Sequence, residues 1–149
     1  SIIEIGQLPH YDEDLDADNP PEEWTEFRRQ VKANDGVFFF TPEYNRSIPG
    51  VLKNAIDVGS RPYGQSAWEG KPVAVASATM SGLGAYLANH TLRQSLVFLD
   101  MPVMQQPEIY LADGMNLFDD DGRVVETSEK FFAEVMEAYA AWVAKILKS

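Results

Sequence analysis

The chain has 149 residues, with 23 Asp or Glu against 12 Lys or Arg, so its formal net charge at pH 7 is −11. This acidic balance disfavours nucleic acids and anionic membrane surfaces as partners, because both require a basic face. The chain has no cysteine, its two histidines lie far apart, and no apolar run approaches the ~20 residues of a membrane span. We therefore expect one domain without a metal site, and, since the first residues lack a signal-peptide pattern, a cytoplasmic location.

The first third of the chain contains one predicted strand end and one predicted helix. Residues 2–5 are apolar apart from one glutamate and indicate the end of a strand. Residues 12–16 are almost entirely acidic and predict a solvated loop. The proline pair at residues 20–21 predicts a helix behind a cap at Asp18 or Asn19, which Gly36 would end.

The rest of the chain alternates between strand and helix patterns. Residues 37–40 form an apolar run without alternation, which predicts a strand covered on both faces. Residues 128–147 carry an apolar stripe at helical spacing, which predicts a core-facing helix. This order predicts an open parallel α/β sheet with helices on both faces. Further helices are expected over residues 49–60 and 85–99, and further strands over 72–76 and 102–110.

Two segments follow predicted strands, at the edge of an open sheet where ligands bind. Residues 41–49 combine a proline, an aromatic ring, an amide and hydroxyls before a helix, which suits a flat ring with polar edges. A turn that simply leads into a helix is the alternative. Residues 77–84 are rich in serine and glycine, so a ligand could approach their backbone. They do not form a dinucleotide fingerprint, and a plain strand-to-helix turn is again the alternative.

Residues 41–45 together with 47–57 closely resemble the signature of the NAD(P)H-dependent FMN reductase family, which includes flavin-dependent quinone, chromate and azo-dye reductases. Shorter matches extend this resemblance over nearly the whole chain. They lie at residues 8–9, 11–15, 92–94, 98–99, 107–108, 118–119, 121–123 and 141–143.

This resemblance implies a flavodoxin-like fold, FMN as the bound cofactor, NAD(P)H as the hydride donor, and a quinone-like or other small acceptor. It also implies a homodimer or homotetramer. Hydride transfer to a flavin needs no side-chain acid, so no catalytic residue is assigned. The cofactor-binding residues implied by the resemblance are Pro42, Glu43, Tyr44, Asn45, Ser77, Thr79, Ser81 and Gly82.

The sequence departs from the family pattern at its start. Family members open with a strand, a phosphate-binding loop and a helix, and this chain begins with the strand that follows them. The expectation is therefore a single flavodoxin-like domain over residues 1–149 that is truncated at its N-terminus. The alternative function is a non-catalytic flavodoxin-like binding module that has lost the site for the flavin phosphate.

Three further features of the sequence lead to predictions. Residues 83–99 carry more apolar side chains than one helix face can hide, which predicts packing against a second subunit. Residues 119–122 resemble part of a calcium loop, but Leu117 and Ser128 occupy positions that need carboxylates, so a turn is expected. His90 lies within a predicted helix, where we expect a hydrogen-bonded or partner-facing histidine and not a catalytic one.

Overall fold

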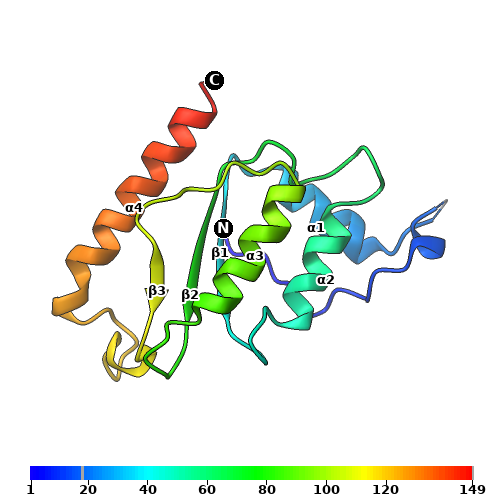
Figure 1. Ribbon diagram of the computed structural model, residues 1–149. Helices are drawn as coiled ribbons and strands as arrows, with labels where there is room; N and C mark the ends of the chain where they lie inside the picture. The colour runs from blue at the N-terminus through cyan, green and yellow to red at the C-terminus, as the bar shows by residue number, and fades with distance from the viewer. Residues whose placement is uncertain (18, 149) are drawn as a thin grey trace.

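In the described part of the chain, three parallel strands lie side by side in the order β1-β2-β3, and four helices pack around them (Figure 1). The computed structural model describes residues 1–17 and 19–148, so the cap expected at Asp18 lies outside the described residues. Pro42 pairs with Ala78, and Ala78 pairs with Leu111, so the carboxyl ends of all three strands meet at one edge. The strands are β1 (Val37–Pro42), β2 (Val73–Ala78) and β3 (Ile109–Leu111).

Helices cover both faces of the sheet, as predicted. Helices α1, α2 and α3 share one apolar cluster with Val73 and Val75 of β2, whereas α4 packs over Ala74 and Ala76 on the opposite face (Figure 1). Alternate residues of β2 therefore face different helices, which explains its run of apolar residues. The helices are α1 (Glu22–Lys32), α2 (Gly50–Gly59), α3 (Tyr86–Phe98) and α4 (Glu126–Ile146), with 3-10 turns η1 (Glu13–Asp16) and η2 (Gly114–Asn116).

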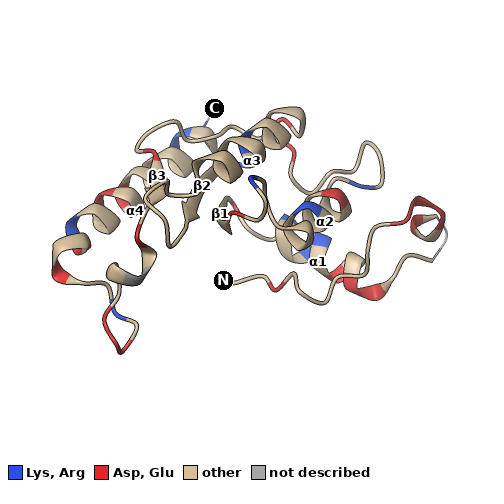
Figure 2. Cartoon of the chain, turned by 60° about the horizontal axis from the view of Figure 1, so that its bottom comes forward, with Lys and Arg blue, Asp and Glu red and all other residues tan. Residues whose placement is uncertain are grey.

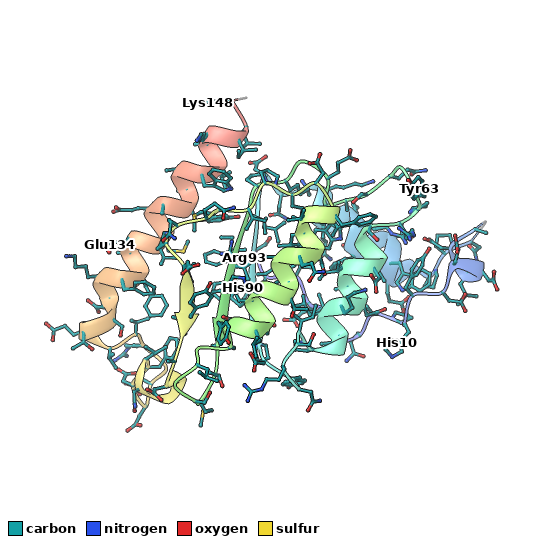
Figure 3. The ribbon with its side chains drawn as sticks, in the orientation of Figure 1. His10, Tyr63, His90, Arg93, Glu134 and Lys148 are labelled. Atoms are coloured by element: carbon teal, nitrogen blue, oxygen red, sulfur yellow. The ribbon has the colours of Figure 1, made fainter. Side chains whose placement is uncertain are left out.

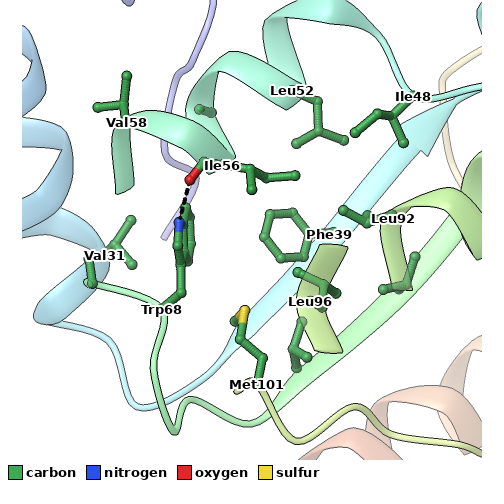
Figure 4. Packing of buried hydrophobic residues seen from close by; sticks show 14 of the residues in the cluster. Val31, Phe39, Ile48, Leu52, Ile56, Val58, Trp68, Leu92, Leu96 and Met101 are labelled. Atoms are coloured by element: carbon green, nitrogen blue, oxygen red, sulfur yellow. Dashed lines mark hydrogen bonds between the residues drawn. The ribbon is translucent and has the colours of Figure 1, made fainter. Parts of the chain in front are cut away.

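The larger core cluster is built around Trp68, which lies between α1, α2 and β1 (Figure 4). Its indole N–H donates a hydrogen bond to the Ile56 carbonyl at 3.0 Å, and its ring contacts those of Phe27 and Phe39. A Cβ on Gly59 would lie 2.4 Å from the indole ring, so only glycine allows α2 to approach Trp68 this closely.

The strand predicted over residues 2–5 is wrong. This segment has no regular hydrogen-bonded structure, although Ile3 and Ile5 pack against the core. The prediction that β1 is covered on both faces is also wrong, because Phe39 is buried but Phe40 is 66% exposed. Within the described residues β1 pairs with β2 alone, so its other edge carries no strand and residues 2–5 pair with none. Phe40 is exposed because it lines an open hollow at the carboxyl end of β1, beyond Phe38, which packs against the cluster under α4.

Several predicted boundaries also move. The cap predicted at Asn19 is wrong, because Pro21 precedes the first residue of α1 and makes no side-chain cap bond. Helix α1 ends at Lys32, before Gly36, whose missing side chain instead leaves room for the Tyr139 hydroxyl. β3 is shorter than predicted. In α4, Val135 is the only described residue that is fully buried, so the core-facing stripe of this helix is narrower than predicted.

The acidic segment before α1 is not simply solvated. Asp16 is 7% exposed, and both of its carboxylate oxygens accept hydrogen bonds from the Arg28 guanidinium, at 2.8 and 2.7 Å. The Arg28 Nε–H donates to the Val58 carbonyl at 2.9 Å. This bidentate pair therefore fastens the acidic segment to α1 and α2.

Charged side chains are spread unevenly over the molecule (Figure 2). Acidic residues gather in η1 and in the first turn of α1. Those in the first turn of α1 stabilise the helix, because they lie at the positive end of its dipole. The predicted turn at residues 119–122 is confirmed, since the Asp119 carboxylate accepts hydrogen bonds from the N–H groups of Asp121 and Arg123. Among the described helices, none is long and apolar enough to cross a membrane.

Candidate functional site

Two loops leave the sheet side by side at the carboxyl ends of β1 and β2. Residues 43–49 follow β1 and residues 79–85 follow β2, and the pairing of Pro42 with Ala78 holds their first residues together. A hollow of about 250 Å³ lies beside them and is lined by Phe40, Thr41, Pro42, Ala76, Ser77, Ala78 and Leu111. The predicted site residues are thus brought to one edge of the sheet.

The first loop contains a tight two-residue turn. Tyr44 and Ser47 exchange backbone hydrogen bonds at 2.9 and 3.0 Å, and the residues between them, Asn45 and Arg46, have φ angles of 51° and 66°. Such a turn needs two residues in the left-handed region, which asparagine tolerates and arginine adopts with strain. The turn places Tyr44, which is 60% exposed, on the open side of the site.

Polar groups of this turn are free to bind a ligand. The backbone N–H groups of Asn45 and Arg46 and the side-chain amide of Asn45 have no hydrogen-bond partner among residues 1–17 and 19–148. In the second turn, the N–H groups of Met80 and Gly82 are likewise unpaired within that part of the chain. Both loops therefore present donors, and Asn45 also presents an acceptor.

Glu43 faces into the protein. One carboxylate oxygen accepts a hydrogen bond from the Ala88 N–H at 3.3 Å, and the other contacts the Arg46 guanidinium at 3.2 Å. The first contact lies in the first turn of α3, where the helix dipole favours a negative charge. Glu43 thus ties the first loop to α3, while its predicted role in cofactor binding stays a prediction.

The second turn has an open side and a buried side. On the open side, the hydroxyls of Thr79 and Ser81 lie 3.4 Å apart, and a Cβ on Gly82 would meet nothing within 4 Å. On the buried side, Ser77 is 1% exposed and donates its hydroxyl hydrogen to the Gly84 carbonyl at 2.7 Å. Of the residues predicted here, Thr79, Ser81 and Gly82 are accessible, whereas Ser77 supports the turn from below.

Gly84 fits the second turn closely against β3. It has a φ of 58°, and a Cβ there would lie 2.7 Å from the Tyr110 Cβ and 2.8 Å from its carbonyl carbon. The segment after β3 also holds this turn, because the Gly114 N–H donates to the Thr79 carbonyl at 3.0 Å. Sequence reasoning did not identify these contacts, although a glycine followed at once by a helix was a signal for a constrained backbone.

His90 is hydrogen-bonded, as predicted. Its Nε2 lies 2.9 Å from the Tyr110 hydroxyl, which donates to the Glu108 carboxylate at 3.0 Å. Burial, and to a lesser extent Glu108, raise the pKa of Tyr110. His90 and Arg93 both lie on α3 (Figure 3). Other side chains of this helix form hydrogen bonds that reach Ser77, beneath the second turn.

An open parallel sheet with helices on both faces, and with two loops side by side at its carboxyl edge, is the architecture of a flavodoxin-like α/β protein. Residues 1–116 match the model of the family described as NADPH-dependent FMN reductase. The chain belongs to this family.

Three relatives show how close the similarity is. A quinone reductase of Pseudomonas putida is 56% identical over 142 residues, which cover 95% of this chain and 76% of that protein. A 2-hydroxy-1,4-benzoquinone reductase of a Burkholderia species is 44% identical, over 95% of this chain and 78% of that protein. Among solved structures, the FerB NAD(P)H:acceptor oxidoreductase of Paracoccus denitrificans is 41% identical with a TM-score of 0.88, covering 95% of this chain and 78% of that one.

Proposed function

We propose that the protein transfers a hydride from NAD(P)H to FMN and passes the electrons to a quinone-like small acceptor. The observation that carries this proposal is the placement of the segment over residues 41–57. This segment starts at the carboxyl end of β1, the edge of the sheet where ligands bind in such folds. The chain that carries it is 56% identical to a quinone reductase. FMN, when bound, supplies the two-electron chemistry, and the chain supplies binding, orientation and exclusion of water.

The residues of the site fit a flavin ring. The ring has a polar edge with donors and acceptors, and the unpaired Asn45 amide and the free N–H of Arg46 match such an edge. Tyr44 supplies an aromatic wall beside it, which excludes water at low entropic cost. The second turn bounds the ring through Thr79 and Ser81, and the absence of a side chain at Gly82 leaves space for a second flat molecule.

We propose that the hydride donor NAD(P)H and the electron acceptor bind one after the other in the space beside Gly82. Met80 and Leu83 border it with apolar side chains that are 69% and 51% exposed. A nicotinamide ring and a quinone are both flat and largely apolar, so each gains by covering these side chains. Pro42 and Glu43 complete the proposed cofactor-binding set by fixing the start of the first loop.

We further propose that residues 1–149 belong to one flavodoxin-like domain, and that the protein acts in the cytoplasm, where the nicotinamide donor is available. The experiment that tests the proposed activity is NADPH and NADH oxidation by the full-length protein with added FMN and 1,4-benzoquinone. We expect oxidation that requires the protein and FMN and is accelerated by the quinone. Protein that binds no FMN and oxidises neither nucleotide would instead support a non-catalytic module.

The exposed face of α3 supports a homodimer or homotetramer. Leu92 and Leu96 are buried within the chain, whereas Val97 and Phe98 are 73% and 84% exposed. The apolar residues of this helix thus form two faces, and one of them has no cover among the described residues. We propose that this face meets its copy in a second subunit across a two-fold axis.

Replacing Val97 with glutamate should convert the assembly into monomers, because the substitution places two charges at an apolar interface. Light scattering at micromolar concentration measures the mass directly. Met136→Glu is the matched control, since Met136 is also an exposed apolar residue, 53% accessible, but lies on α4. A monomeric wild-type protein, or an equal effect of both substitutions, would contradict the proposed interface.

A further inference from the structure

A chain of side-chain hydrogen bonds connects α3 to the buried side of the second turn. The Ser77 hydroxyl donates to the Gly84 carbonyl at 2.7 Å. The Asn89 side chain, which is 0% exposed, donates to the Ser77 hydroxyl oxygen at 3.2 Å and to the Val75 carbonyl at 3.4 Å. Asn89 therefore lies directly behind the turn that borders the proposed flavin site.

The series of hydrogen bonds continues from Asn89 to the segment before β3. The Arg93 Nε–H donates to the Asn89 side-chain oxygen at 2.8 Å, and another guanidinium nitrogen donates to the Met104 carbonyl at 3.1 Å. Arg93 lies one helical turn after Asn89, so both side chains lie on the same side of α3. Through Arg93, the backbone of the segment before β3 is thus linked to Asn89.

Each side chain in this series of hydrogen bonds can take only one role, as donor or as acceptor, toward the next. Ser77 uses its single hydroxyl hydrogen on Gly84, so its oxygen can only accept from Asn89. Asn89 uses its NH2 group there and on Val75, so its oxygen is left to accept from Arg93. An amide is the group that meets both demands, because a carboxylate would face the Ser77 and Val75 oxygens without a hydrogen to donate.

We propose that Asn89, itself oriented by Arg93, is a positioning residue that holds the second turn in the geometry that receives the flavin ring. The proposal rests on the proposed function, in which FMN binds against this turn. Without the Asn89 amide, the Ser77 hydroxyl is free to rotate, and the Gly84 carbonyl loses its fixed partner. The turn then samples other conformations, and binding must select the competent one.

Four variants test this role: Ser77→Ala, Asn89→Ala, the double variant, and Thr91→Ala. Thr91 is the matched control, because it lies on α3 and its hydroxyl donates to the Leu87 carbonyl, away from the turn. The first readout is hydrogen exchange of residues 79–87 in the flavin-free protein. The second is the FMN dissociation constant, and melting temperature is recorded for every variant.

We expect Ser77→Ala and Asn89→Ala to speed exchange in the turn and to weaken FMN binding by about 10- to 100-fold, in line with the loss of a buried hydrogen-bond partner. Because both act through one contact, the double variant should lose little more than either single variant. Thr91→Ala should change neither readout.

Unchanged exchange in the turn for Asn89→Ala, or losses that add up in the double variant, would overturn the positioning role. A lower melting temperature with unaltered FMN affinity in a flavin-binding wild type would overturn it as well, because Asn89 would then serve only the core. If the wild-type protein binds no FMN, the proposed function fails, while the exchange measurement still decides whether Asn89 holds the turn.

Discussion

Replacing Gly84 with alanine should lower FMN-dependent NADPH oxidation by about 100-fold, the cost of an ångström-scale misplacement at a reacting site. The added Cβ would lie 2.8 Å from the Tyr110 carbonyl carbon, and backbone atoms of a paired strand cannot move aside. The second turn must therefore shift away from β3, and it carries Thr79 and Ser81 with it. Steady-state rates at saturating NADPH measure the loss.

Gly70→Ala separates the close approach from backbone strain. Gly70 also has a left-handed backbone, with a φ of 73°, but a Cβ there would meet nothing within 4 Å. This control should therefore lose only about 1–2 kcal/mol of stability, from the left-handed conformation alone. It should retain its activity. Equal activity in the Gly84 and Gly70 variants would refute the close fit between the second turn and β3.

Replacing Arg28 with methionine should reduce the free energy of unfolding by about 3–5 kcal/mol, because it leaves a buried carboxylate without its partner. The side chains of Arg28 and Asp16 are 10% and 3% exposed, and their closest atoms are 2.7 Å apart. The substitution also leaves the Val58 carbonyl without the Arg28 Nε–H. Urea unfolding followed by tryptophan fluorescence measures the change.

Arg29→Met is the matched control for this prediction. Arg29 is the next residue of α1 and pairs with Glu26 at 2.6 Å, but the two side chains are 68% and 44% exposed. An exposed pair contributes little to stability, so this variant should unfold close to the wild-type midpoint. Equal destabilisation by the two substitutions would show that burial of the Asp16–Arg28 pair is not what matters.

Local patterns predicted much of the fold. The apolar run of β2 and the proline before α2 give local signals of a buried strand and a helix start, and both elements form close to the expected bounds. The residues that follow β1 and β2 were expected at one edge of the sheet, because parallel strands end together there. These features depend on neighbours in sequence or on general rules of sheet topology.

Other features depend on which distant residues come together, and the sequence does not encode these in a local pattern. Asp16 belongs to an acidic segment that predicts exposure, yet Arg28 of the following helix, 12 residues away, covers it. Phe40 has the composition of a buried strand residue but lies on an open face. Asn89 has no local signal for its role, because its partner Ser77 is 12 residues away, on β2.

The central claim is that a flavin ring lies against the first loop, and an FMN titration of wild-type, Tyr44→Ala and Asn45→Gly protein tests it most directly. Glycine is chosen at Asn45 because it keeps the left-handed turn, which has a φ of 51° there. Arg46→Gly is the control, since it changes the neighbouring left-handed residue and retains both proposed contacts. We predict that Tyr44→Ala and Asn45→Gly each weaken FMN binding by about 1–3 kcal/mol, with melting temperatures near the wild-type value. Arg46→Gly should bind FMN like the wild type, whereas equal FMN affinity in all four proteins would contradict the claim.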